Sequence, residues 1–343
     1  MTDNKNSTLS PTEFLAKKYF DQGEKYFTGD GVPVDFKKAV TNYEQSAKFD
    51  YTPAVFSLGV CYIRGLGVDK NERRAYELIK RAAEAGNLDA QFTLGHFYFE
   101  GSVVERDYKK AVEIFDESAK KGHPGGMNDL GFCYQRGLGV EQDDARAFEC
   151  FSQAAQADFP AAQNNVGDCY NFGRGVEADP EKAYLYYYRA AQSGYAVAQN
   201  NVGMCCLNGH GVKRDYEQAV KWFEESGKLG NPVAIANLGF CYETGRGVEK
   251  SAEKAVQLYT ISADAESAPG QFNLAKCLRD GNGAKQDKER AFSLFKRAAE
   301  NGFPMAYAEL ALCYTDGIGT KPDKELAEKF KKLSADAGYP VKE

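Results

Sequence analysis

The sequence predicts an all-α protein, a right-handed α-solenoid built from nine 36-residue helix-turn-helix units. Steps of 36 residues from Ala39 meet an alanine every time, at 75, 111, 147, 183, 219, 255, 291 and 327. The same steps from Gly29 meet a glycine every time, at 65, 101, 137, 173, 209, 245, 281 and 317. A fixed period of this size is typical of repeat proteins, so we expect one array instead of the two domains that 343 residues would suggest.

Residues 52–87 illustrate why each unit should contain two helices. Ala54, Leu58, Cys61 and Tyr62 share one face of a helix, and Gly65 is suited to end it. A good helix N-cap follows in every unit, where a side chain can accept a hydrogen bond from a free backbone N–H of the second helix. These N-caps are Asp35, Asn71, Asp107, Asp143, Asp179, Asp215, Ser251, Asp287 and Asp323.

The expected boundaries follow the period. We expect a polar tail and helix extension at 1–16, an array at 17–339, and a short tail at 340–343. The units are expected at 17–51, 52–87, 88–123, 124–159, 160–195, 196–231, 232–267, 268–303 and 304–339, and we number them repeats 1 to 9. Ser10 and Glu13 form a capping-box pattern around Pro11, which predicts an early start and unusual length for the first helix. In the last helix Lys331 replaces an apolar residue, as expected of a solubilising end cap that completes the array.

Charge and hydropathy exclude several functions. A net charge of −6 argues against nucleic acid as the main ligand. There is no apolar run long enough for membrane insertion and no signal-peptide pattern at the start, so we expect a cytoplasmic protein.

The period and its motif resemble the Sel-1-like repeat family, a relative of the tetratricopeptide repeat. Leu238-Gly239 through Gly245-Arg-Gly247-Val248 matches the family pattern, as does Leu130-Gly131 through Gly137-Leu-Gly139-Val140. The departures are Val103 for the second turn glycine, Ala275 and Ala311 for the helix glycine, and Cys206 and Leu278 for the tyrosine. The resemblance implies a non-catalytic scaffold or adaptor that binds other proteins, without a cofactor.

The cysteines form a column of their own. Seven of the nine share one repeat position, namely Cys61, Cys133, Cys169, Cys205, Cys241, Cys277 and Cys313. Equivalent residues on packed helices lie about 8–10 Å apart, whereas a disulfide needs Cα atoms within about 7 Å. We therefore expect buried thiols rather than the disulfides of secreted cysteine-rich relatives, and no metal site, because no Cys-x-x-Cys spacing occurs.

The candidate binding surface lies on the first helix of each unit, opposite its core side. By analogy with tetratricopeptide solenoids, this face should line a concave groove. A polar column there includes Asp129, Asn165, Asn201, Asn237 and Asn273, whose amides could bind the backbone of an extended peptide. The alternative is that each Asn bonds loop backbone in its own or the next repeat.

Neighbouring groove positions vary between repeats, as specificity determinants would. The apolar N-terminal end contains Phe56, Ile63, Phe92 and Phe99; further along lie Phe132, Asp168, Met204, Phe240 and Lys276. Exposed apolar surface marks interaction sites, although these aromatics could instead pack on residues 1–16 or on adjacent helices. The partner is predicted to be a protein or peptide, and the chain a monomer or weak homodimer. A self-assembling structural protein is a second possibility.

An enzyme is the competing class. The histidines His96, His123 and His210 occupy three different repeat positions, and a surface location is favoured for His96. Some cysteine-rich relatives are labelled β-lactam hydrolases, and Ser118, Ser251 and Ser293 each begin a Ser-x-x-Lys pattern. The Ser-Asp-Asn and Lys-Thr-Gly motifs that accompany this pattern in such enzymes are absent. We therefore interpret these serines as surface or cap residues of second helices. Trp222, the single tryptophan, is predicted to pack between repeats.

A basic column lies just inside the N-caps, at Lys38, Arg74, Lys110, Arg146, Lys182, Lys254 and Arg290. Positive charge there opposes the helix dipole, so we expect acidic neighbours to compensate it.

Overall fold

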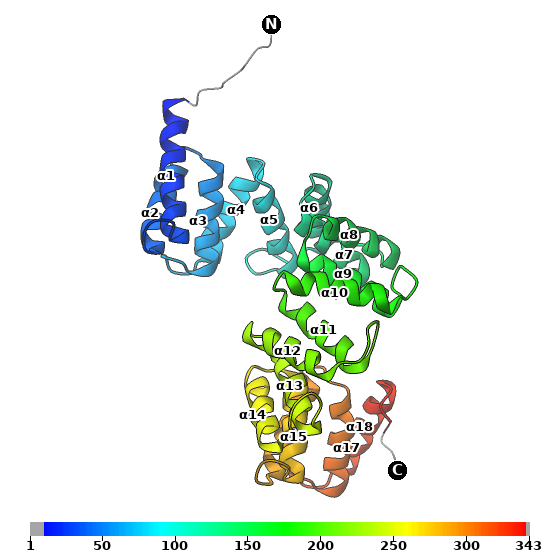
Figure 1. Cartoon of the computed structure of the whole chain (residues 1–343). Coiled ribbons are helices and arrows are strands. Elements are labelled where there is room, and N and C mark those ends of the chain that lie inside the picture. The colour runs from blue at the N-terminus through cyan, green and yellow to red at the C-terminus, as the bar shows by residue number, and fades with distance from the viewer. Residues whose placement is uncertain (1–9, 341–343) are drawn as a thin grey trace. The chain divides into compact units, whose positions relative to one another are not determined.

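A computed structural model describes residues 10–340, all of it helical or irregular with no strand in that range. Each 36-residue repeat contributes a first helix, here called the A helix, and a second helix, called the B helix (Figure 1). The A helices are α1 (Pro11–Thr28), α3 (Thr52–Arg64), α5 (Leu88–Glu100), α7 (Pro124–Arg136), α9 (Pro160–Phe172), α11 (Ala196–Asn208), α13 (Pro232–Thr244), α15 (Ala268–Asp280) and α17 (Met305–Asp316). The B helices are α2 (Phe36–Ala47), α4 (Glu72–Glu84), α6 (Tyr108–Lys120), α8 (Asp144–Gln156), α10 (Pro180–Gln192), α12 (Tyr216–Lys228), α14 (Ala252–Asp264), α16 (Lys288–Glu300) and α18 (Lys324–Asp336).

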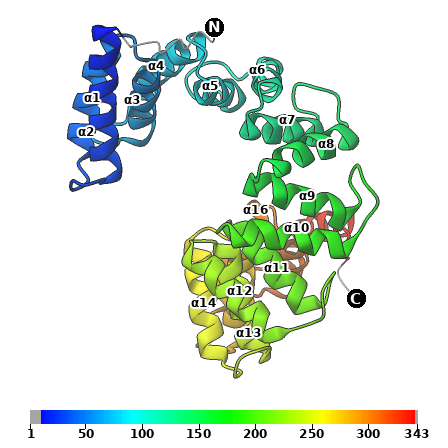
Figure 2. The ribbon, with the colours of Figure 1, turned by 45° about the horizontal axis from the view of Figure 1, so that its top comes forward.

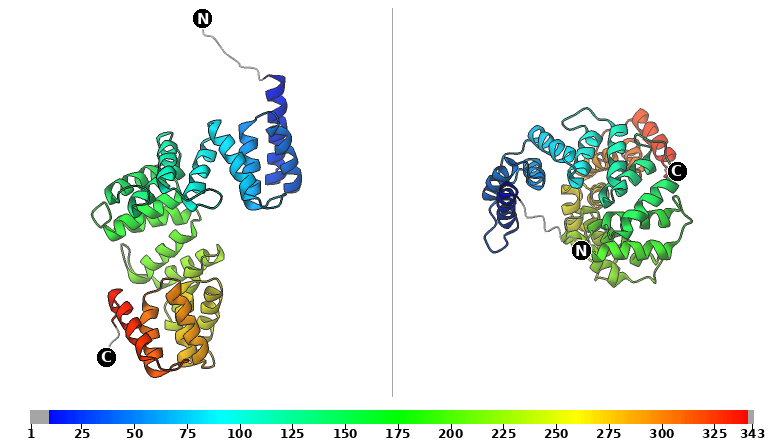
Figure 3. Two further views of the ribbon diagram at one scale, coloured as in Figure 1. Left: turned by 180° about the vertical axis from the view of Figure 1, so that it is seen from behind. Right: turned by 90° about the horizontal axis from the view of Figure 1, so that it is seen from above.

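Contacts divide the described chain into two compact units. The first runs from residue 10 to 162 and includes 174–176; the second comprises 163–173 and 177–340. Within the N-terminal unit, α1 lies along α2 and α3 along α4 (Figure 2). Within the C-terminal unit, α13 to α18 pack as successive antiparallel pairs, seen from behind in Figure 3. Each unit is therefore a stack of helix hairpins in which neighbours supply the buried surface.

The predicted helix ends are confirmed. All nine predicted N-cap side chains accept a hydrogen bond from the backbone of their B helix. Ser10 and Glu13 form the capping box, and α1 has 18 residues where the other helices have 12 or 13. The expected tail residues 1–9 and 341–343 lie outside the described part of the chain.

The A and B helices of a repeat approach closely at the helix glycine. A Cβ atom on Gly203 would lie 2.6 Å from the ring of Phe223, and one on Gly239 would lie 2.8 Å from the ring of Tyr259. Both rings are fully buried. The glycine thus leaves space for a large side chain of the partner helix, as its place on the helix predicts.

The second glycine of the turn, which every repeat except repeat 3 has, joins consecutive repeats. At Gly139, Gly211, Gly247 and Gly319 the backbone φ is positive, and an added Cβ would overlap a backbone carbonyl of the first residue in the preceding B helix. Gly31 has the same positive φ but no atom within 4 Å of that Cβ position, because it belongs to the first repeat among the described residues. Glycine is required at the inner positions both for conformation and for space.

This difference yields a matched pair of variants. Gly31→Ala should lower the free energy of unfolding by about 1 kcal/mol, the cost of a left-handed conformation alone. Gly247→Ala should lower it by about 3 kcal/mol, because the new methyl group also displaces the neighbouring repeat. Urea unfolding followed by circular dichroism measures both, and equal losses would contradict the contact between repeats.

Candidate functional site

Two asparagines of the A-helix column bridge consecutive repeats. The Asn201 side-chain Nδ2 donates to Asn164 Oδ1 at 2.9 Å, and Asn237 Nδ2 donates to Asn200 Oδ1 at 2.8 Å. All four side chains are buried or half-buried. The alternative in which these amides bond loop backbone is wrong for Asn201 and Asn237, because their partners are amides on the preceding A helix.

The bridges fix which part of each amide remains available. An amide has two N–H donors and an oxygen acceptor, and each bridge uses one donor. Among the described residues, the Oδ1 atoms of Asn201 and Asn237 accept no hydrogen bond. The two carbonyl groups are therefore held in fixed orientations with acceptor capacity to spare.

The column ends differently on either side. At its N-terminal end Asp129 lies 2.9 Å from the Nε2 atom of His96 and also accepts from Asn128. In the C-terminal unit the half-buried Asn273 forms no hydrogen bond with a described side chain, and Asn165 is also half-buried.

In the C-terminal unit, several of the predicted groove residues line a hollow of about 320 Å³. Asp168, Asn201 and Met204 line it, together with His210 of the following turn. Tyr187 donates its hydroxyl to Asp168 at 2.7 Å, and burial raises the pKa of this tyrosine, with the nearby Asp168 carboxylate adding to the shift. The hollow thus offers a carboxylate, an amide carbonyl and a flexible thioether to a ligand.

The N-terminal aromatics are half-buried and pack on adjacent helices. Phe92 contacts Phe115 with ring centroids 6.1 Å apart, and Phe99 contacts the same ring at 6.3 Å. Phe56 and Ile63 lie against the core of the first repeats. Only part of each side chain is therefore available to a partner.

A smaller hollow of about 220 Å³ opens on this aromatic end, lined by Ile63, Thr93 and His96 among others. His96 is half-buried, with its ring edge-on to Phe92 at 4.8 Å. The His96 side chain is 38% exposed, as the expected surface location requires, and it also contacts Asp129.

Three of the remaining predicted groove residues, Phe132, Phe240 and Lys276, form cation–aromatic contacts. Phe132 is 37% exposed, and the Arg136 guanidinium lies 5.7 Å from its ring. Arg246 lies 5.1 Å from the Phe240 ring, and the Lys276 ammonium lies 5.8 Å from the ring of Phe272.

The three Ser-x-x-Lys patterns do not assemble a nucleophile. Ser251 accepts from the Lys254 backbone as an N-cap, and Ser293 is an exposed B-helix residue. Ser118 is fully buried, so the expectation that it lies at the surface is wrong; its small side chain faces the tightly packed Gly126. Among the described residues, no group of three His, Cys, Asp or Glu side chains could hold a metal ion.

All nine cysteines are free thiols, and the seven of the column are buried. Burial raises the pKa of the Cys241 thiol to about 11 and that of Cys133 to about 12. Such thiols are poor nucleophiles at neutral pH, so the column contributes to packing.

The basic column has partners that the sequence indicated and others that it did not. Lys38 and Lys182 pair with the N-cap carboxylates of Asp35 and Asp179, as expected. In addition, most of these cations lie over an aromatic ring of their own repeat. The pairs are Lys38 on Tyr26, Lys110 on Tyr98, Arg146 on Tyr134, Lys182 on Tyr170 and Lys254 on Tyr242. We call the position of these rings the tyrosine column. In repeat 6 both positions change together, to Cys206 and Gln218, and this joint change in the sequence indicates that the tyrosine and the cation form a pair.

The Sel1 repeat family accounts for this architecture. Its profile matches residues 23–48 and then 52–87, 88–123, 124–159, 160–195, 196–231, 232–267, 268–303 and 304–339. The chain therefore belongs to the Sel1 repeat family, whose members are generally scaffolds for protein interactions. No curated protein sequence matches the chain. Within residues 10–340, no helix combines the length and apolar character needed to cross a membrane.

Two solved structures are similar over most of their length. A protective antigen from uropathogenic Escherichia coli with this repeat fold is 28% identical, with a TM-score of 0.61, covering 96% of this chain and 80% of that one. A Sel1 repeat protein from Oxalobacter formigenes is 27% identical, with a TM-score of 0.62, covering 71% of this chain and 96% of that one.

The raised thiol pKa values predict alkaline sensitivity. An unfolded thiol ionises near pH 8.5, so above that pH the unfolded chain releases protons that the folded chain keeps, and the free energy of unfolding falls. For Cys241 this loss should extend from about pH 8.5 to its folded pKa of about 11, with a slope of at most about 1.4 kcal/mol per pH unit. Cys241→Ala should flatten the curve above pH 9 in urea unfolding. Parallel pH curves for the two proteins would contradict the assignment.

Proposed function

We propose that this protein is a non-catalytic scaffold that binds an extended segment of a partner protein along its A-helix face. The single observation that carries the proposal is the pair of inter-repeat amide bridges at Asn201 and Asn237. They hold two side-chain carbonyls one repeat apart, where backbone N–H groups of a peptide could donate to them. Backbone recognition of this kind tolerates many side chains.

Side-chain selectivity would come from the positions beside the amides. Asp168 and Met204 line the hollow that Asn201 enters, and they suit a cationic or apolar side chain. Half-exposed Phe132 and Phe240 offer aromatic contacts in other repeats. We infer a cytoplasmic protein that acts as a monomer or weak homodimer, with binding rather than catalysis as its activity.

The test is a triple substitution, Asn165→Ala with Asn201→Ala and Asn237→Ala. Three lost hydrogen bonds of about 1 kcal/mol each should weaken a bound partner about 100-fold, so the partner should disappear from affinity purification analysed by mass spectrometry. Asn282→Ala, an exposed turn asparagine, is the matched control and should retain the partner.

Loss of partner counts only if the triple variant unfolds at a urea concentration close to that of the wild type, because two of its amides also bridge repeats. An undiminished partner signal from the folded triple variant would refute the amide site.

A further inference from the structure

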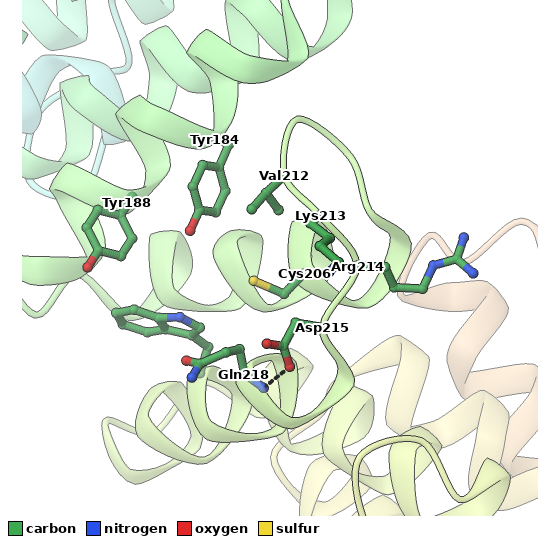
Figure 4. Close-up of a pocket in the computed structure, with 9 residues that line it drawn as sticks. Tyr184, Tyr188, Cys206, Val212, Lys213, Arg214, Asp215 and Gln218 are labelled. Carbon is green, nitrogen blue, oxygen red and sulfur yellow. Dashed lines mark hydrogen bonds between the residues drawn. The ribbon is translucent and has the colours of Figure 1, made fainter.

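A third hollow, of about 510 Å³, lies between repeats 5 and 6, and none of the groove residues lines it. Tyr184 and Tyr188 of α10 lie on one side, and Gln218 of α12 lies on another (Figure 4). Trp222, also of α12, lines the same hollow. Cys206 of α11 forms its base, with Val212, Lys213, Arg214 and Asp215 from the following turn.

The equivalent place between repeats 2 and 3 is filled by this chain itself. Tyr76, the counterpart of Tyr184, has its hydroxyl 3.2 Å from that of Tyr98, a member of the tyrosine column. The Lys110 ammonium lies 4.2 Å from the centre of the Tyr98 ring. A phenol ring is therefore the natural occupant of this position in the repeat.

Repeat 6 lacks both members of that pair. Cys206 stands where the other repeats have mostly tyrosine, and Gln218 stands where they have mostly lysine or arginine. Cys206 is 4% exposed, and its side chain is smaller than the phenol ring that a tyrosine would place there. The missing ring and the missing ammonium account for the position of the hollow.

The sides of the hollow consist of aromatic rings and of polar groups that lack a hydrogen-bond partner among the described residues. Tyr188 and Trp222 meet edge to face at 5.9 Å, and Tyr184 lies 5.9 Å from Tyr188. Among the described residues, neither tyrosine hydroxyl, nor the Trp222 indole N–H, nor the Gln218 amide has a hydrogen-bond partner. Edge-to-face contacts and a hydroxyl partner are what a phenol ring would find here.

The charged residues at the edge of the hollow indicate which charge should flank the bound ring. Lys213 and Arg214 are exposed, while the Asp215 carboxylate accepts from the Gln218 backbone and so is already engaged as the N-cap. Arg214 extends away from the hollow in Figure 4, which leaves Lys213 as the cation at its edge. A carboxylate beside the incoming ring would complement this ammonium group.

We propose that this hollow is a docking site for a tyrosine side chain flanked by acidic residues in a partner protein. The partner's ring takes the place of the missing member of the tyrosine column and stacks among Tyr184, Tyr188 and Trp222. This site is separate from the asparagine groove and does not depend on it.

The single tryptophan provides a direct readout. The indole N–H of Trp222 gives one resonance in a ¹H–¹⁵N spectrum, which can be followed while acetyl-Glu-Tyr-Glu-amide is added. We expect a saturable shift with a dissociation constant of about 1 mM, the range for a single buried side chain. Acetyl-Lys-Tyr-Lys-amide should bind several-fold more weakly.

Tetramethylammonium is the competing probe, because aromatic walls can also hold a cation. A shift with this ion and none with the acidic peptide would overturn the proposal in favour of a cation cage. No shift with either probe would also overturn it, and so would an equal or stronger affinity for the lysine peptide.

Two variants test the location. Cys206→Tyr restores the repeat pattern and fills the hollow, so it should abolish the shift without lowering the urea midpoint. Leu278→Tyr restores the same column position in repeat 8 and should leave peptide binding unchanged. Tyr188→Ala removes one aromatic side of the hollow and should weaken peptide binding at least tenfold. It tests the same location if Cys206→Tyr perturbs folding. Unchanged binding by both Cys206→Tyr and Tyr188→Ala would place the peptide elsewhere and refute the proposal.

Discussion

The contact between a turn and the preceding B helix is the constraint on which this architecture depends. The second turn glycine lies against the first carbonyl of that helix so closely that no side chain fits. Its positive φ directs the chain into the next B helix, whose N-cap carboxylate then accepts a backbone N–H three residues on. Each repeat thereby sets the position of the next, which explains why a 36-residue spacing is kept without insertion or deletion.

Three of the hollows lie where the repeat pattern is broken. Val103 replaces the turn glycine and does not adopt its positive φ, and the hollow lined by Ser102 and Glu72 opens beside it. Cys206 and Leu278 replace members of the tyrosine column, and each lines a hollow, of about 510 and 570 Å³ respectively. In repeat 3 the tyrosine and the cation of the pattern occupy this interface themselves, whereas their replacement in repeat 6 leaves space that another molecule can enter.

The sequence was sufficient for the fold because every structural column repeats nine times. Alanine and glycine positions, N-caps and the long first helix were all predictable from local spacing. The site was less predictable, since side-chain partners depend on packing between repeats. Nothing in a single repeat indicates that Asn201 reaches Asn164, or that the Phe92 ring packs against the Phe115 ring at 6.1 Å. The tyrosine-cation pairing could have been inferred, because Cys206 and Gln218 depart from the pattern together in one repeat.

The most direct measurement of the central claim is the effect of one alanine inserted into a turn. Between Arg246 and Gly247 the insertion would move the glycine away from the Tyr216 carbonyl and break the spacing within the C-terminal unit. Between Asp30 and Gly31, in the first repeat of the described chain, the same insertion disturbs no such contact. Urea unfolding followed by circular dichroism should show a lower midpoint or a second transition for the first insertion and a near-normal curve for the second. Indistinguishable curves for the two insertions would contradict the claim that turn contacts hold the repeats in register.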